Sequence, residues 1–258
     1  WPQRQVTVVV PFTAGGTTDL FGRIIADGLQ QKYGKPFIVE NRAGAGGNVG
    51  SAVVAKAAPD GYTLLIGTIS SHAINPYVYK NIPYDVDKDF APVSLIATLP
   101  NMLAVGKAVP ANTFKEFVDY VKANPGKLNF ASSGAGTSPH LAAELFALKT
   151  GTKMTHVPFR SSGDTMNALL GGHVQFAFDN ATIVLPQVKA GNVKGLAVTT
   201  KERSAMAPDI PAVAETIPGF EAPSWHGVFF PAGVSKAVVD QVSADVRAIL
   251  TNPTVAKR

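Results

Sequence analysis

The chain has 258 residues, of which 46% are hydrophobic and 16% charged, and its formal net charge is +5. This length and hydrophobic content allow one large domain or two modest ones with a substantial core, and the absence of cysteine excludes disulfides, thiolate zinc sites and cysteine nucleophiles. Because the lysines and arginines are scattered along the chain, we expect a solvated basic surface that steers anions inward and no nucleic-acid partner.

The first part of the chain alternates strand and helix patterns. The apolar periodicity predicts strands at residues 5–10, 37–39 and 62–66 and helices at residues 19–31 and 48–57. Gly34 is expected to end the first of these helices, because glycine readily adopts the left-handed conformation that follows a helix. The order is strand, helix, strand, helix, strand.

The second part repeats this order. We expect strands at residues 128–131, 155–159 and 174–178, a helix that ends at Gly151, and a short helix at residues 164–170. Ser138 is the predicted N-cap of the longer helix, with Pro139 at its first helical position. The repeated order predicts two α/β units, each a mostly parallel sheet flanked by helices.

Two further segments are expected to join the units. Residues 93–105 carry the chain forward, residues 208–231 bring it back, and a helix at residues 235–250 then packs on the first unit. We therefore predict a two-lobed α/β clamshell with a ligand cleft between the lobes and a hinge at the two crossings. The predicted lobes are residues 1–101 with 223–258, and residues 102–222.

Each unit has a glycine-rich, hydroxyl-bearing turn between its first strand and first helix, VPFTAGGTTD at 10–19 and FASSGAGTSP at 130–139. Such a turn presents backbone N–H groups and the positive end of a helix dipole to an anion. Ligands of open α/β sheets bind beyond the strand ends, so two such turns predict one small anionic ligand held by both. The candidate residues in these turns are Phe12, Gly16, Thr17, Thr18, Asp19, Ser133, Gly136, Thr137 and Ser138.

Three further candidates follow predicted strands. His72 lies after a strand end and is a candidate for a ligand contact. Arg160, in a serine-rich turn, either pairs bidentately with a carboxylate or is a solvated loop residue. Asp179 either takes a ligand hydroxyl or amine or holds a loop.

Motifs for other chemistries are incomplete. The glycines at 44–50 lack the G-x-G-x-x-G spacing and an acidic ribose partner, so no nucleotide is expected. Ser133, His140 and Asp179 form a conceivable hydrolase triad, but no G-x-S-x-G motif is present, and we assign no catalytic residue. The five histidines show no paired ligand spacing, so we expect neither a metal nor a cofactor.

Several motifs are characteristic of one known family: PFTAGG at 11–16 followed by Asp19, VENRAGAGG at 39–47, PDGYTL at 59–64, YD at 84–85, FDN at 178–180, LAVTT at 196–200 and DIPAVAE at 209–215. With these motifs the chain resembles the Bug receptors, the periplasmic solute-binding proteins of tripartite tricarboxylate transporters. The resemblance extends over nearly the whole chain. The chain departs from the family pattern at Thr17, where proline or serine is expected, and at residues 160–162, where a Lys-Gly-like turn is expected.

The resemblance implies a periplasmic receptor that grips a small carboxylate, often a dicarboxylate or an aromatic acid, by the two turns and delivers it to membrane permease subunits. We expect a monomer without enzymatic activity; the alternatives are a ligand-sensing partner of a signalling system and an α/β hydrolase-type enzyme. The start at Trp1 is consistent with a removed signal peptide. The end at Arg258 is consistent with a truncated or missing C-terminal helical segment of the family.

Overall fold

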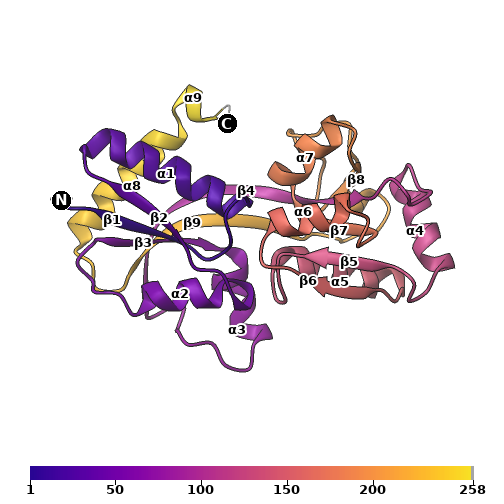
Figure 1. Cartoon of the computed structure of the whole chain (residues 1–258), viewed down its shortest axis with the longest axis horizontal. Helices are drawn as coiled ribbons and strands as arrows, with labels where there is room; N and C mark the ends of the chain where they lie inside the picture. The colour runs from indigo at the N-terminus through magenta and orange to yellow at the C-terminus, as the bar shows by residue number, and fades with distance from the viewer. Residues whose placement is uncertain (257–258) are drawn as a thin grey trace. The chain divides into compact units, whose positions relative to one another are not determined.

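A computed structural model describes residues 1–256 of the chain (Figure 1). The chain forms two compact units, unit 1 from Trp1–Thr98 with Trp225–Arg258, and unit 2 from Leu99–Ser224. It passes from one unit to the other within strand β4 (Phe90–Val105) and returns within strand β9 (Pro223–Pro231). Residues 257 and 258, which belong to the predicted first lobe, lie outside the described residues.

Unit 1 is built on three parallel strands. Strand β1 (Val6–Val10) lies between β2 (Phe37–Asn41) and β3 (Thr63–Thr68), and β3 pairs antiparallel with β9. The helices of this unit are α1 (Thr17–Tyr33), α2 (Asn48–Ala55), α3 (Asn75–Val78), α8 (Lys236–Leu250) and α9 (Pro253–Ala256). A 3₁₀ turn (Ala45–Gly47) precedes α2, and a π-helical turn (Ser70–Ile74) precedes α3.

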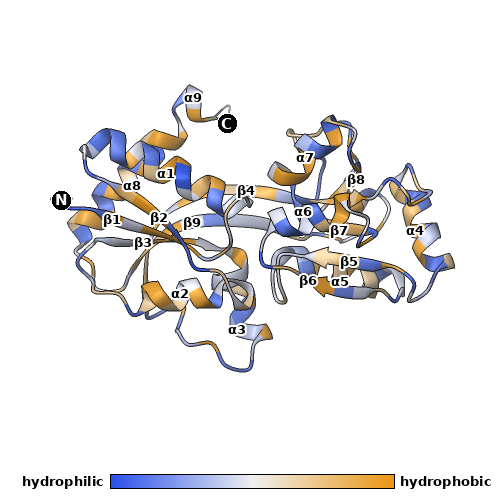
Figure 2. Ribbon diagram, in the orientation of Figure 1, coloured by the Kyte–Doolittle hydropathy of each residue, from blue (hydrophilic) through white to orange (hydrophobic). Residues whose placement is uncertain are grey.

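Both faces of the unit 1 sheet are covered, which explains why its strands are almost continuously apolar. On one face, Val8 and Val10 of β1 pack in a buried cluster with Ile25 of α1 and Val242 of α8. On the other face, Val9 packs in a separate cluster that includes residues of α2 and β3. Figure 2 shows β1 and β3 as mostly hydrophobic, whereas α1 alternates between hydrophobic and hydrophilic residues.

Unit 2 repeats the parallel plan. Strand β5 (Asn129–Ser132) lies between β6 (Thr155–Pro158) and β7 (Phe176–Asn180), β4 pairs antiparallel with β7, and β8 (Lys194–Val198) pairs antiparallel with β4. The helices of unit 2 are α4 (Phe114–Ala123), α5 (Ser138–Thr150), α6 (Ser162–Leu170) and α7 (Ala181–Lys189), and a 3₁₀ turn (Val213–Glu215) lies before β9.

The core of unit 2 also has two sides. Large aromatic residues fill the side of α4 and α5, among them Phe117, Phe146 and Phe176. Smaller side chains fill the side of α6 and α7, including Ala177 of β7 and Leu169 of α6. This arrangement leaves the carboxyl ends of β5 and β7 next to each other, because the two strands are parallel.

The predicted fold class and the strand–helix order of both units are confirmed. Helix α1 begins at Thr17 rather than at residue 19, because Gly16 serves as its N-cap. The prediction that Ser138 caps α5 is wrong: Thr137 is the N-cap and Ser138 is the first helical residue. The two segments expected as connections contain β4 and β9, so strands rather than loops join the units. In the described part of the chain, no helix combines the length and the hydropathy that crossing a membrane requires.

Candidate functional site

The turn between β1 and α1 is held by the buried carboxylate of Asp19 in the first turn of the helix. Its two oxygens accept hydrogen bonds from the Gly15 N–H at 3.1 Å, from the Arg23 guanidinium at 2.9 and 3.1 Å, and from the Asn41 amide at 2.9 Å. Asn41 also donates to the backbone oxygen of Phe12 at 3.0 Å. Burial raises the pKa of Asp19, but the hydrogen bonds from Arg23, Asn41 and Gly15 outweigh it and hold the pKa below its usual value.

The start of α1 combines uncapped backbone donors with hydroxyl groups. The N-cap residue, Gly16, has extended backbone geometry, and no side chain caps the helix. The N–H groups of a first helical turn have no acceptor within the helix, so their hydrogen-bond partners lie outside it. Thr17 and Thr18 are both buried, and the Oγ1 of Thr18 lies 3.2 Å from the Nε2 of His226 in β9. Such a helix start is suited to an anion.

The turn between β5 and α5 follows the same plan. The Gly136 N–H donates to the Nδ1 of His140, four residues later, at 3.2 Å. In unit 1 the Gly15 N–H likewise donates to Asp19, four residues later. The N-cap, Thr137, uses its hydroxyl to donate to the backbone oxygen of Gly134 at 2.7 Å, and again no side chain caps the helix. The residue before the donating glycine is an exposed alanine in both turns, Ala14 in unit 1 and Ala135 in unit 2.

The two turns differ in the acceptor that holds them. In unit 2 the acceptor is the imidazole of His140, which stacks on His156 with 4.0 Å between the ring centroids. Burial lowers the pKa of His140, although Glu144 at 3.6 Å acts in the opposite direction. Burial, together with His140, lowers the pKa of His156 to about 4. Both rings are therefore neutral at pH 7, so this turn is held without the charge that Asp19 brings to unit 1.

Two of the unit 1 candidates lie among apolar side chains. Phe12 is buried and its ring faces the backbone of Gly47, where an added Cβ would be 3.3 Å from the ring. His72 stacks on Phe229 with 4.2 Å between centroids, and its Nδ1 is 2.9 Å from the hydroxyl of Ser71. Burial lowers the pKa of His72 to about 4. A contact of His72 with a ligand stays a prediction.

Asp179 is completely buried at the end of β7. One of its oxygens accepts hydrogen bonds from the Ser162 hydroxyl at 2.5 Å and from the Asn180 N–H at 2.8 Å. The other, Oδ2, has no hydrogen-bond partner among residues 1–256. Burial raises the pKa of Asp179 to about 6, against the effect of these two donors. The Oδ2 atom can therefore accept a hydrogen bond from a donor group such as a ligand hydroxyl or amine.

Arg160 is exposed and lines a cavity of about 450 Å³ together with Asp164 and Asn167 of α6 and with His173. Trp225 lines an apolar groove of unit 1 together with Leu95. A contact of Arg160 with a ligand stays a prediction.

Two residues of the conceivable hydrolase triad, His140 and Asp179, have partners outside the triad. His140 bonds to the Gly136 N–H, Asp179 bonds to Ser162, and no hydrogen bond joins either of them to Ser133 within the described chain. The serine that does meet a histidine is Ser132, whose hydroxyl is 2.6 Å from the Nε2 of His156. Ser132 is fully buried and accepts the Gly134 N–H at 3.1 Å, so it shapes the turn.

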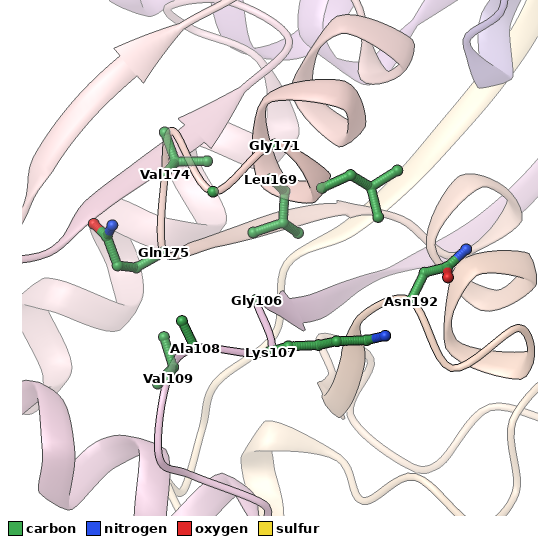
Figure 3. Close-up of a pocket in the computed structure, with 11 residues that line it drawn as sticks. Gly106, Lys107, Ala108, Val109, Leu169, Gly171, Val174, Gln175 and Asn192 are labelled. Carbon is green, nitrogen blue, oxygen red and sulfur yellow. The ribbon is translucent and has the colours of Figure 1, made fainter.

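A cavity of about 380 Å³ lies at the opposite end of the unit 2 sheet (Figure 3). It is lined by Gly106 and Lys107, which follow β4, by Gln175, which precedes β7, and by Asn192, toward which the Lys107 side chain extends. The candidate turn of unit 2 follows the carboxyl end of β5, so this cavity is separate from it. Within residues 1–256, no cluster of three or more His, Asp or Glu side chains is arranged to hold a metal ion.

Some residues of the site were not predicted. Arg23 stands four residues after Asp19, a spacing that signals an ion pair on a helix, and Asn41 belongs to the VENRAGAGG motif, so both had a readable signal. His226 contacts Thr18 across 208 positions of the sequence, and no local pattern predicts that contact.

Comparison with known proteins places the chain in a family. Residues 21–258 match the family described as tripartite tricarboxylate transporter family receptor. Rpa4515 of R. palustris, solved with adipate, is 40% identical with a TM-score of 0.96 over 99% of this chain and 86% of that one. The periplasmic binding protein BugD is 35% identical with a TM-score of 0.95 over 100% and 86%. MatC (Rpa3494) from Rhodopseudomonas palustris, with bound malate, is 34% identical with a TM-score of 0.94 over 100% and 88%. The chain therefore belongs to the tripartite tricarboxylate transporter receptor family, as its resemblance to the Bug receptors predicts.

Proposed function

We propose that this protein is an extracytoplasmic solute-binding receptor that captures a small organic acid, a dicarboxylate or an aromatic acid, through its two strand-to-helix turns. The observation that carries the proposal is the repeat of one hydrogen-bonding plan in both units. In each turn, a glycine N–H is held by the side chain four residues later, and the following helix begins uncapped. The helix N-termini then offer their remaining N–H groups to a carboxylate.

The chemistry of capture follows from the cost of burying a charge. A carboxylate that leaves water needs hydrogen-bond donors in its new site, because an unpaired buried charge is strongly unfavourable. The turns supply backbone N–H groups and the hydroxyl-bearing residues Thr17, Thr18 and Ser138. A ligand that bonds to both turns stabilises the conformation in which both reach it. Arg160 and Asp179 are proposed to act on the rest of the ligand molecule.

The solved relatives support this ligand class, since Rpa4515 holds adipate and MatC holds malate. We further propose that the protein is exported to the periplasm, acts as a monomer, leaves the acid unchanged and delivers it to the membrane permease subunits of a tripartite transporter. The family description supports the transporter partner. The alternative is that the protein acts as the ligand-sensing partner of a signalling system.

The test is a thermal-shift screen against carboxylic acids, followed by calorimetry of each hit and mass spectrometry of the recovered acid. We expect one acid to stabilise the protein strongly and to be recovered intact. The Thr18→Val and Ser138→Ala variants are expected to weaken its binding by about 10- to 100-fold each, the loss of a hydrogen bond to a charged group.

Two controls make the result decisive. The Thr251→Val variant removes an exposed hydroxyl at the end of α8 and is expected to bind like the wild type. Denatured protein is analysed by mass spectrometry for an acid retained from expression. Unchanged affinity in both turn variants would refute binding by the two turns, and conversion of the acid would refute the receptor function.

A further inference from the structure

A buried contact links strand β9 to the candidate turn of unit 1. His226 is almost fully buried, and its Nε2 lies 3.2 Å from the Oγ1 of Thr18 in the first turn of α1. The ring packs edge-on against Phe21 with 5.0 Å between centroids. The other ring nitrogen, Nδ1, is buried and has no hydrogen-bond partner in the described part of the chain.

The position of His226 is set by the sheet. It pairs with Thr68 of β3 in the antiparallel register between β3 and β9. Its side chain therefore reaches α1 from a hydrogen-bonded strand and not from a loop. It also directly follows Trp225, with which the returning chain enters unit 1.

The surroundings of His226 favour one of its two neutral tautomers. Burial lowers the pKa of His226 to about 3, so the ring carries a single N–H at pH 7. If the hydrogen were on Nδ1, a buried N–H donor would be unpaired, which is rare in folded proteins because of its cost. If the hydrogen is on Nε2, it is paired with the Thr18 hydroxyl oxygen, and only a lone pair on Nδ1 lacks a partner.

The tautomer determines what the Thr18 hydroxyl can do. A hydroxyl has one hydrogen to donate and accepts through its oxygen. When His226 donates to that oxygen, the hydroxyl hydrogen is not used by His226, and it lies at a helix start that attracts anions. We infer that His226 is a positioning residue, which donates from Nε2 to Thr18 and thereby fixes the Thr18 hydroxyl as a donor to the carboxylate of the captured acid. The last step rests on the proposed function.

The tautomer can be measured without any ligand. In protein uniformly labelled with ¹⁵N, long-range proton–nitrogen NMR spectra distinguish protonated from unprotonated ring nitrogens, and the His226→Gln variant assigns the signals. We expect a protonated Nε2 and an unprotonated Nδ1 that persist between pH 5 and pH 8. A protonated Nδ1, or an imidazolium in this range, would overturn the inference.

The effect on binding is measured by calorimetry with adipate, malate and the other acids of the screen. His226→Leu removes the donor and is expected to weaken binding about tenfold, whereas His226→Gln keeps an N–H near the Nε2 position and restores most of the affinity. In the Thr18→Val background, His226→Leu is expected to cause no further loss, because the two residues act as one unit. Thr18→Ser keeps the hydroxyl and serves as the second conservative variant.

The outcomes separate the inference from the proposed function. Independent, additive losses from His226→Leu and Thr18→Val would overturn the positioning role even if the protein binds an acid well. If His226→Leu does not fold, the comparison of His226→Gln with the wild type, and of Thr18→Ser with Thr18→Val, decides the same question. If the wild type binds no acid, the proposed function and the donor role of Thr18 both fail, while the NMR result still decides which nitrogen of His226 is protonated.

Discussion

Replacing Asp19 by asparagine tests whether its carboxylate holds the unit 1 turn. Each of its oxygens accepts two hydrogen bonds: Oδ1 from Arg23 and Asn41, and Oδ2 from Arg23 and Gly15. In Asp19→Asn one oxygen becomes an NH₂ group, which cannot accept, so two of the four bonds are lost in either orientation of the amide. At about 1 to 1.5 kcal/mol for each bond, the free energy of unfolding should fall by about 2 to 3 kcal/mol.

The assay is urea denaturation followed by tryptophan fluorescence, at a series of pH values. Because the folded-state pKa of Asp19 is lowered, its contribution is present above the unfolded-state pKa and is lost as the pH falls through the folded-state pKa. The difference between wild type and Asp19→Asn should therefore be constant from pH 7 to pH 5 and shrink in stronger acid.

The matched control is Asp27→Asn, which removes an exposed carboxylate from the same helix and should change stability by less than about 0.5 kcal/mol. Equal stability of the wild type and Asp19→Asn at pH 7 would refute the reasoning. So would a difference that stays undiminished in acid.

Three further predictions concern buried positions. Asp179 has a raised pKa, so its contribution to stability is present in acid and is lost as the pH rises through about 6. In urea titrations at a series of pH values, the Asp179→Asn variant should not show this loss of stability. A variant with the same pH profile as the wild type would contradict the prediction. Gly50→Ala would place a Cβ 2.7 Å from the Cα of Pro11 and 2.8 Å from the backbone oxygen of Arg42, so it should destabilise the protein by about 1 to 3 kcal/mol in the same assay, whereas Val53→Ala on the exposed face of α2 should not. Phe146→Ala should cost about 3 to 5 kcal/mol, because the ring is fully buried in unit 2; a cost below 1 kcal/mol would show that the core collapses around it.

The secondary structure was predictable where local chemistry decides it. Gly34 and Gly151 end α1 and α5 with φ values of 63° and 65°, as their position after an apolar periodic segment predicts. The first residues of the helices were harder to predict, because several residues with side-chain hydroxyls follow one another in both turns. Ser138 is a good N-cap by type, but the backbone of Thr137 has the extended geometry of the cap.

The site was predictable where its contacts are local, as in the glycine-rich turns and in the pairing of Asp19 with Arg23 four residues later. The glycine-rich turns identify where donors gather, since their conformation follows from nearby residues. Other contacts that orient side chains are long-range: His226 approaches Thr18 because β9 pairs with β3, and Ser162 reaches Asp179 because α6 packs near β7. Such contacts depend on the packing of whole elements, and a single sequence carries no local signal for them.

The bracing of each turn from within its own helix has a consequence for receptor engineering. Asp19 and His140 secure the backbone donors by bonds that involve no ligand atom. In the proposed receptor, the backbone donors are therefore ordered before an acid arrives, so binding does not carry the free-energy cost of ordering them. Under the proposed function, the selectivity for different acids would be redesigned at other positions, such as Arg160, while the two turns still bind the carboxylate. A library of variants for new acids should vary those positions and leave the two bracing side chains untouched.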